Sequence, residues 1–141
     1  NISRQRRFYN VVLRVIPLQI RTFEELNLPN VMRDLAQIRR GCVLVTGATG
    51  MGKSTTLATM IEEVNKVRKA KIVTIEDPIE FVFTHDKSII TQREIGTDTD
   101  SFPQALRAAA KALRDRLQAA TGLRAAVRIA TLDPDTYIAL K

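Results

Sequence analysis

Apolar residues recur along this chain with two different spacings, which alternate along the sequence. β-branched runs at 11–16, 43–45 and 71–75 are typical of strands, because short length and side-chain branching favour a strand over a helix. After residue 53 the apolar residues recur every three to four positions, which predicts an amphipathic helix with Leu57, Met60, Ile61 and Val64 on one face. A strand, a crossover helix and a second strand form a βαβ unit. The pattern therefore predicts an α/β domain with a parallel sheet.

The segment before the second apolar run carries the signals of helix starts. Thr22 and Glu25 have the spacing of a capping box, in which each side chain binds the other residue's backbone N–H group. Pro29 suits the first turn of a following helix, and Gly41 would end that helix. We expect its apolar face to hold Val31, Leu35 and Ile38.

The last third of the chain begins with the pattern of a long helix. Ser101 and Gln104 have the spacing of a second capping box, and the amphipathic pattern after them continues to about Ala120. Beyond it, residues 125–131 could form a short strand. Residues 133–135 read Asp-Pro-Asp and are expected to start another helix.

Length and composition indicate one domain, or most of one, in 141 residues. The sequence begins at Asn1 and ends at Lys141 within a helical pattern, so we expect a piece of a longer protein. No apolar run approaches the roughly 18 residues that a membrane-spanning helix needs, and no signal peptide is visible. The single cysteine, Cys42, opens the predicted strand at 43–45 and is expected to be a core thiol. One cysteine permits no internal disulfide, which fits a reducing cytosol.

The net charge of +7 raises the question of nucleic acid as a partner. The alternative is a solvated surface together with arginines that face nucleotide phosphates or a neighbouring subunit. The chain has five phenylalanines, two tyrosines and no tryptophan, and they do not interleave with the basic clusters as a base-stacking platform requires. The composition therefore argues against nucleic-acid binding.

Residues 47–54 read G-x-x-x-x-G-K-S between a predicted strand and a predicted helix, which is the context of a phosphate-binding loop. Its glycines allow the backbone N–H groups to point inward, and the helix adds its positive end. Lys53 would reach the β- and γ-phosphates, and the Ser54 hydroxyl would bind Mg²⁺. The expected nucleotide-binding residues are Gly47, Ala48, Thr49, Gly50, Met51, Gly52, Lys53, Ser54 and Thr55.

Three carboxylates follow the predicted strand at 71–75: Glu76, Asp77 and Glu80. Ligands of open α/β sheets bind at the carboxyl ends of the strands. Carboxylates at that edge can hold Mg²⁺ through water or orient an attacking water molecule. An acidic, solvated turn is the alternative, and the neighbouring phosphate loop favours a functional role.

With these motifs the chain resembles the secretion-type hexameric ATPases, and among them the type IV pilus retraction ATPases that drive twitching motility. The resemblance covers residues 1 to about 109. The segments that carry it are Leu13–Pro17, Glu24–Leu26, Leu44–Gly47, Thr49–Gly50, Gly52–Thr56, Thr74–Val82, Gln92–Glu94 and Ala105–Arg107.

The resemblance implies a partial RecA-like P-loop NTPase domain over residues 21–141. Residues 1–20 would be the end of a smaller N-terminal domain and its linker, with 11–16 as its last strand. It also implies ATP and Mg²⁺ as ligands, homo-hexameric rings in the intact family, and an inner-membrane pilus platform protein as partner. The expected location is the cytoplasmic face of the inner membrane, without a membrane-spanning segment.

The resemblance also assigns roles to site residues. Glu80 would act on the attacking water and, with Lys53, form the catalytic pair, while Glu76 and Asp77 complete the acidic box. Arginines that reach the γ-phosphate in the family come from the preceding domain and linker. The candidates here are Arg4, Arg6, Arg7 and Arg14.

The sequence departs from the family pattern after Arg107. The family has an apolar strand ending in Gly-Glu there, the Walker B element, whereas residues 111–131 are rich in Ala, Arg and Leu. Residues 133–136 resemble the start of a later helix, and 129–133 are a weaker candidate for a replacement Walker B strand. Two alternatives therefore stay open: a nucleotide-binding piece deficient in hydrolysis, and a related type II secretion or pilus assembly ATPase.

Overall fold

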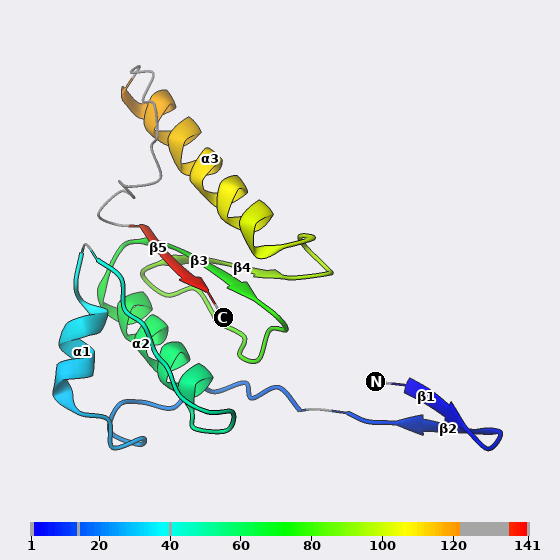
Figure 1. Ribbon diagram of the computed structural model, residues 1–141. Helices are drawn as coiled ribbons and strands as arrows, with labels where there is room; N and C mark the ends of the chain where they lie inside the picture. The colour runs from blue at the N-terminus through cyan, green and yellow to red at the C-terminus, as the bar shows by residue number, and fades with distance from the viewer. Residues whose placement is uncertain (1, 14, 40, 122–135, 141) are drawn as a thin grey trace.

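A three-stranded parallel sheet in the order β4-β3-β5 organises the chain in the computed structural model (Figure 1). The structure describes residues 2–13, 15–39, 41–121 and 136–140. Its strands are β1 (Ile2–Gln5), β2 (Phe8–Val11), β3 (Lys71–Glu76), β4 (Ile89–Glu94) and β5 (Thr136–Leu140). Its helices are α1 (Asn30–Ala36), α2 (Lys53–Val67) and α3 (Phe102–Thr121).

Strand β3 lies in the centre of the sheet and is buried on both faces. Lys71 is in register with Ile89 of β4 and Thr136 of β5, so all three strands run in the same direction. Ile72 faces α2, whereas Val73 and Ile75 face α3, as the period of two along a strand requires. The strand predicted at 71–75 is therefore confirmed, and its apolar run is explained by cover on both sides.

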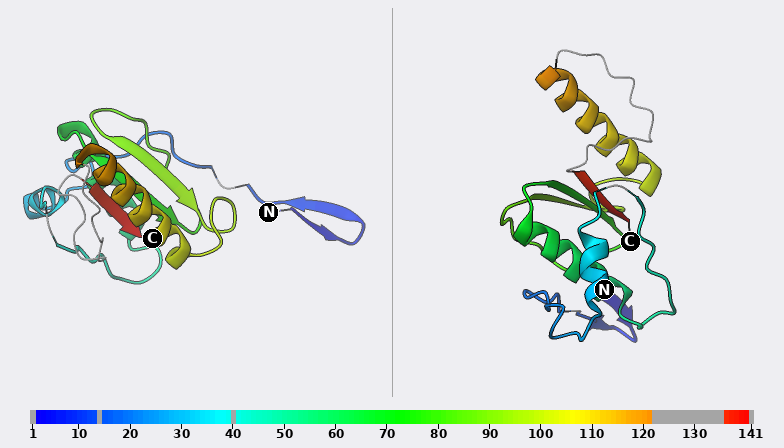
Figure 2. Two further views of the ribbon diagram at one scale, coloured as in Figure 1. Left: turned by 90° about the horizontal axis from the view of Figure 1, so that it is seen from above. Right: turned by 90° about the vertical axis from the view of Figure 1, so that its left-hand side faces the viewer.

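Helices cover the two faces of the sheet, as the three views show (Figures 1 and 2). On one face, α2 and the preceding segment build a cluster of Phe23, Ala36, Met60, Val64, Ile72 and Ile90. On the other face, Ala105 of α3 packs with Val73 and Ile75. The helix predicted to start near Lys53 and the one predicted from residue 101 to about 120 are thus confirmed as α2 and α3, and so is the apolar stripe of α2.

Helix α1 is present, but its predicted apolar face is wrong. Ala36 is buried and Met32, one turn earlier, packs against the same cluster. The predicted face residues Val31, Leu35 and Ile38 are exposed. Apolar residues occupy more than one stripe of this short helix, so spacing alone could not decide which stripe meets α2. The Thr22–Glu25 capping box does form, with both reciprocal hydrogen bonds, but it closes a turn and not a helix.

The strand predicted at 43–45 and the buried thiol at Cys42 are both wrong. Residues 42–47 form no strand, Cys42 is exposed, and the Leu44 side chain is 81% exposed. The physical reason is the topology of the sheet: β3 already pairs with β4 on one edge and β5 on the other. The expected βαβ unit through α2 therefore does not form among the described residues.

The N-terminal residues form a β-hairpin that stands apart from the sheet and helices (Figures 1 and 2). β1 and β2 pair antiparallel around Arg6 and Arg7, which have φ angles of +48° and +71°. Positive φ at both central positions is the geometry of a tight two-residue turn. The strand predicted at 11–16 is wrong in its bounds, because β2 ends at Val11, where its pairing with Ile2 ends. The domain boundary at residue 20 stays a prediction.

The C-terminal residues pair with the sheet where a helix start was expected. Thr136–Leu140 form β5, whose register places Leu140 beside Ile75. The apolar positions among these five residues fit either a helix or a strand. They form a strand because they pair with the open edge of β3. The possible strand at 125–131, the weaker Walker B candidate at 129–133 and the Asp-Pro-Asp at 133–135 lie outside the described residues.

Candidate nucleotide-binding site

The glycine-rich loop runs directly into the first turn of α2. Gly50 and Gly52 both have φ of +82°, a left-handed conformation that strains any residue with a side chain. Gly52 is the N-cap of α2 and makes no side-chain capping bond. The N–H groups in the first turn have no acceptor within a helix and, together with the helix dipole, form an anion-binding end. The glycines at these positions are thus explained by backbone geometry.

Lys53 is folded back over the loop that precedes it. Its Nζ donates a hydrogen bond to the Ala48 carbonyl oxygen, 2.9 Å away, and the Met51 N–H donates to the same oxygen across 3.4 Å. Residues 46–51 are exposed. The loop therefore presents an ammonium group and a helix N-terminus to solvent side by side, as binding of a phosphate chain requires.

Glu76 is the one buried carboxylate among the described residues. Its side chain ends β3 on the face that α2 covers, and the residue is only 4% exposed. Its Oε1 accepts hydrogen bonds from the Thr74 hydroxyl at 2.7 Å and from Gln92 Nε2 at 3.0 Å. These two donors offset part of the cost of burying a carboxylate.

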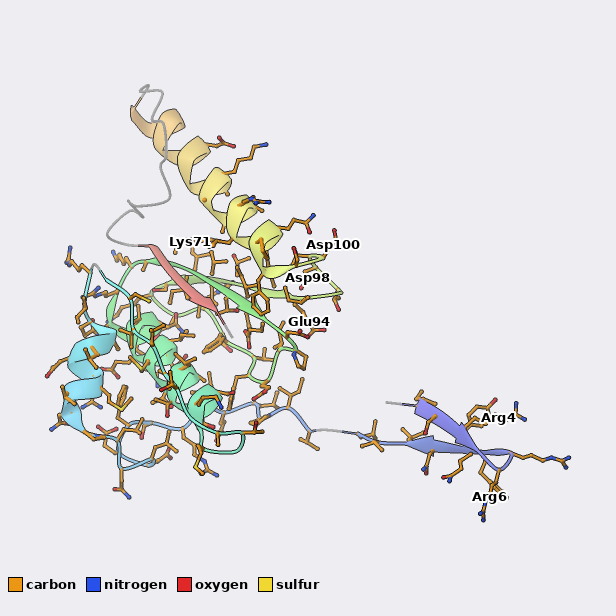
Figure 3. The ribbon with its side chains drawn as sticks, viewed as in Figure 1. Arg4, Arg6, Lys71, Glu94, Asp98 and Asp100 are labelled. Atoms are coloured by element: carbon orange, nitrogen blue, oxygen red, sulfur yellow. The ribbon has the colours of Figure 1, made fainter. Side chains whose placement is uncertain are left out.

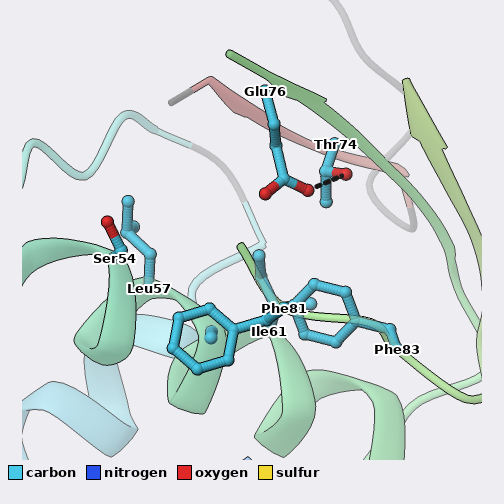
Figure 4. Close-up of a pocket in the computed structure, with 8 residues that line it drawn as sticks. Ser54, Leu57, Ile61, Thr74, Glu76, Phe81 and Phe83 are labelled. Carbon is cyan, nitrogen blue, oxygen red and sulfur yellow. Dashed lines mark hydrogen bonds between the residues drawn. The ribbon is translucent and has the colours of Figure 1, made fainter. Parts of the chain in front are cut away.

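A small cavity of about 20 Å³ separates Glu76 from the first turn of α2 (Figure 4). Ser54 contributes to the opposite wall, and both residues face the same space. The remaining lining residues are Leu57, Ala58, Ile61, Thr74, Phe81 and Phe83. A cavity of this size holds about one water molecule. The structure thus brings Ser54 and Glu76 to one site, as expected of a strand that ends beside a phosphate loop.

The other two acidic residues lie in the loop after β3. Asp77 is exposed and Glu80 is half-buried. The backbone on either side of Glu80 is held by side chains of β4: the Ile79 N–H donates to Glu94 Oε2 at 2.9 Å, and Gln92 Nε2 donates to the Phe81 carbonyl at 2.8 Å. The three residues of the acidic box therefore lie in two places: the Glu76 carboxylate is buried and faces α2, and Asp77 and Glu80 lie in the loop after β3.

The structure does not bring the candidate arginines to the phosphate loop of their own chain. Arg4, Arg6 and Arg7 belong to the hairpin and are exposed (Figure 3). The Arg4 guanidinium lies over the Tyr9 ring, 5.9 Å from its centroid. Arg14 lies outside the described residues.

Two site residues, Thr74 and Gln92, were missed by sequence reasoning. A polar residue in the middle of an apolar strand, two positions before Glu76, was the available signal, because residues i and i+2 share a face. In the sequence, Gln92 stands out only as part of the Gln-Arg-Glu segment 92–94. Its contact with Glu76 depends on the register that sets Thr74 opposite Gln92, and spacing along the chain does not contain that register.

The side chains on the facing walls of the cavity match the donor set of a Mg²⁺ ion that takes few protein ligands. Within the described ranges, no three His, Cys, Asp or Glu side chains gather as a metal site would need. Mg²⁺ in nucleotide sites commonly keeps several waters and takes one or two protein ligands plus phosphate oxygens. The Ser54 hydroxyl and the Glu76 carboxylate on facing walls match that donor set. None of the described helices is long and apolar enough to span a membrane.

Comparison with known proteins decides the family. The sequence model of the type II/IV secretion system proteins matches residues 5–138. The chain belongs to this family. The type IV pilus ATPase PilU of Pseudomonas aeruginosa is 52% identical over 103 residues, which are 73% of this chain and 27% of PilU. The type IV pilus retraction ATPase PilT of the same organism is 47% identical over 109 residues, which are 77% of this chain and 32% of PilT.

A solved structure of the family confirms the fold. The crystal structure of the pilus retraction motor PilT with bound ADP superimposes with a TM-score of 0.77 at 41% identity. The match covers 99% of this chain and 41% of that one. The α/β ATPase fold and the resemblance to the retraction ATPases are thus confirmed. The chain spans between about a quarter and a third of the length of the curated relatives it matches.

Proposed function

We propose that this chain is the nucleotide-binding part of a type IV pilus retraction ATPase, which couples ATP hydrolysis to pilus disassembly and twitching motility. The observation that carries the proposal is that Ser54, at the end of the phosphate loop, and the buried Glu76 line one small cavity. The similarity to two pilus ATPases, PilU and PilT, supports the choice of motor within the family. PilT was crystallised with ADP, which supports a nucleotide as the ligand here.

Each site residue has a chemical role in this proposal. Residues 47–55 and the N-terminus of α2 bind the phosphates, and Lys53 supplies a positive charge to the β- and γ-phosphates. Ser54, with Glu76 through water, would hold Mg²⁺, which neutralises charge on the phosphates when bound. Glu80 orients the attacking water and accepts its proton, and Asp77 completes the acidic box.

The proposal includes a ring of subunits. Arg4, Arg6 and Arg7 belong to the hairpin of β1 and β2, which stands apart from the sheet and helices (Figure 1). Arginines in that position would serve the site of a neighbouring copy, which fits a homo-hexamer with ATP at the subunit boundaries. The intact motor would act on an inner-membrane pilus platform protein from the cytoplasmic face of that membrane. Nucleic acid has no role in the proposal.

A second candidate function, nucleotide binding without efficient hydrolysis, is favoured by β5. That strand occupies the edge of β3 beside the site, and its five residues Thr136–Leu140 include no carboxylate. Phosphoryl transfer depends on several positioned charges acting together. A strand without an acid at this edge therefore favours nucleotide binding with no detectable cleavage by this chain. A type II secretion or pilus assembly ATPase stays the alternative within the family.

The decisive experiment is a titration of the 141-residue chain with ATP, with and without Mg²⁺, followed by single-turnover cleavage of radiolabelled ATP. We expect binding, tighter with Mg²⁺, and slow cleavage that Glu80→Gln abolishes while affinity stays within about threefold. Loss of one preorganised catalytic group costs about two to three orders of magnitude in rate. A folded chain that binds no ATP would refute the proposal. Binding with no cleavage would favour the second candidate.

A further inference from the structure

Two side chains of β4 hold the loop that carries Glu80. We call residues 77–83 the acidic loop. Glu94 Oε2 accepts a hydrogen bond from the Ile79 N–H at 2.9 Å. Gln92 Nε2 donates to the Phe81 carbonyl at 2.8 Å, and Gln92 Oε1 accepts from the Phe83 N–H at 3.0 Å. Three backbone groups of the acidic loop are thus fixed by two side chains.

The residues that bond to each other recur every two positions both on β4 and on the acidic loop. Gln92 and Glu94 are two residues apart on a strand, so both side chains leave the same face of β4. The three loop residues that they bind are also two apart, at positions 79, 81 and 83. The loop therefore lies beside β4, and the backbone groups that flank Glu80 on both sides are held.

Gln92 also connects the acidic loop to the buried carboxylate. Its Nε2 donates to Glu76 Oε1 at 3.0 Å as well as to the Phe81 carbonyl, so both amide hydrogens have acceptors. Phe81 and Phe83 line the cavity that Ser54 and Glu76 share. A movement of the loop at these residues would change the wall of the cavity and the carboxylate together.

We propose that Gln92 and Glu94 are positioning residues that fix the acidic loop against β4 and thereby set the place of Glu80 relative to the phosphate loop. This inference rests on the proposed function and assigns a role to the Gln-Arg-Glu segment that nucleotide binding itself does not require. Arg93, between them, points away from the loop and lines a polar cavity with Asp98 and Gln104. The motif thus divides into two positioning side chains and one on the opposite face.

The test compares Gln92→Ala and Glu94→Ala with Gln104→Ala. Gln104 is a matched control, because its Oε1 likewise accepts a backbone N–H, from Asp100 at 2.9 Å, but in another loop. We expect the Phe83 amide in Gln92→Ala, and the Ile79 amide in Glu94→Ala, to exchange hydrogen about tenfold faster by NMR, as loss of one hydrogen bond implies. We expect single-turnover ATP cleavage to fall about a hundredfold. ATP affinity should stay within about threefold, and Gln104→Ala should change neither quantity.

Conservative variants separate positioning from folding. Glu94→Gln keeps an oxygen that can accept the Ile79 N–H, so we expect it to retain most of the cleavage rate. Gln92→Glu keeps the acceptor for Phe83 but sets a second carboxylate against Glu76. It should therefore cleave ATP more slowly than wild type, while its Phe83 amide exchanges hydrogen at the wild-type rate. If Gln92→Ala does not fold by circular dichroism, Glu94→Ala carries the same prediction.

The outcomes distinguish this inference from the proposed function. A wild-type chain that binds and cleaves ATP, with a Gln92→Ala or Glu94→Ala variant that cleaves at the wild-type rate, would overturn the inference alone. Faster amide exchange with unchanged cleavage would reduce the two residues to a structural role and overturn it as well. A wild-type chain that binds ATP without cleaving it would favour the second candidate function and would overturn a catalytic positioning role for the two residues. A wild-type chain that binds no ATP would overturn the proposed function first.

Discussion

The ammonium group of Lys53 lies 2.9 Å from the carbonyl oxygen of Ala48 and donates a hydrogen bond to it. This contact joins the first residue of α2 to the middle of the glycine-rich loop, five residues earlier. The lysine therefore arches over the loop at the place where the helix N-terminus is most positive. That arrangement concentrates positive charge for an anionic ligand.

Replacing Lys53 should weaken nucleotide binding. A charge-assisted hydrogen bond contributes about 1.5–3 kcal/mol, and each 1.4 kcal/mol is about a factor of ten in affinity. We expect Lys53→Ala to raise the Kd for Mg²⁺-ATP by roughly ten- to a hundredfold in calorimetry. Lys66→Ala is the matched control, since Lys66 is exposed on the same helix and pairs with Glu62 at 3.5 Å. Equal affinities of wild type and Lys53→Ala would contradict the assignment.

Gly52 and Gly96 allow backbone strain to be separated from a binding defect. Both have φ of +82°, and a Cβ added at either position would meet nothing within 4 Å. Alanine at either position should therefore lower the free energy of unfolding by a similar amount, about 1–2 kcal/mol, through strain alone. Gly52 lies in the phosphate loop and Gly96 does not. We expect only Gly52→Ala to weaken ATP binding as well. Urea unfolding measures the stability of each variant, and a fluorescence titration measures its affinity for ATP. Equal loss of affinity in both variants would argue against a phosphate cradle.

Thr74 should be needed to keep the buried Glu76 carboxylate stable. The Thr74 hydroxyl donates to Glu76 Oε1 at 2.7 Å, and both residues are buried. Thr74→Val preserves shape but removes this donor, so we expect urea unfolding to show a loss of about 1–3 kcal/mol. Thr74→Ser keeps the hydroxyl and should lose less. A valine variant as stable as wild type would mean that the hydrogen bond contributes nothing net.

Glu24 should make a pH-dependent contribution to stability. The hydrogen bond from Arg33, 2.6 Å long, is the main cause that lowers the pKa of the Glu24 carboxyl below its usual value. Because the native pKa is lowered, the contribution is fully present above the ordinary glutamate pKa of about 4.3 and disappears as the pH falls through the native value. We expect the difference in unfolding free energy between wild type and Glu24→Gln to shrink over that interval. Urea unfolding at a series of pH values measures it. A difference that does not depend on pH would contradict this origin.

The sequence by itself determined the elements whose signals are local. Backbone conformation explains the glycines of the phosphate loop, and helical spacing explains the start of α2 at Lys53 and its apolar stripe. Both depend only on residues that are neighbours in the sequence. The same holds for β3, whose length and branching favour a strand in any context. These elements also carry the candidate site, so most of its residues could be named before the fold was known.

Tertiary structure alone decided which segment pairs with β3. The runs at 43–45 and 136–140 are both short and apolar enough for a strand, but β3 has only two edges, and β4 and β5 occupy them. Strand pairing is a competition for a limited number of edges between segments far apart in sequence, so propensity within each segment does not settle it. The contact of Gln92 with Glu76 has the same origin. It depends on the register between β3 and β4, whose residues Ile72 and Ile90 pack together under α2.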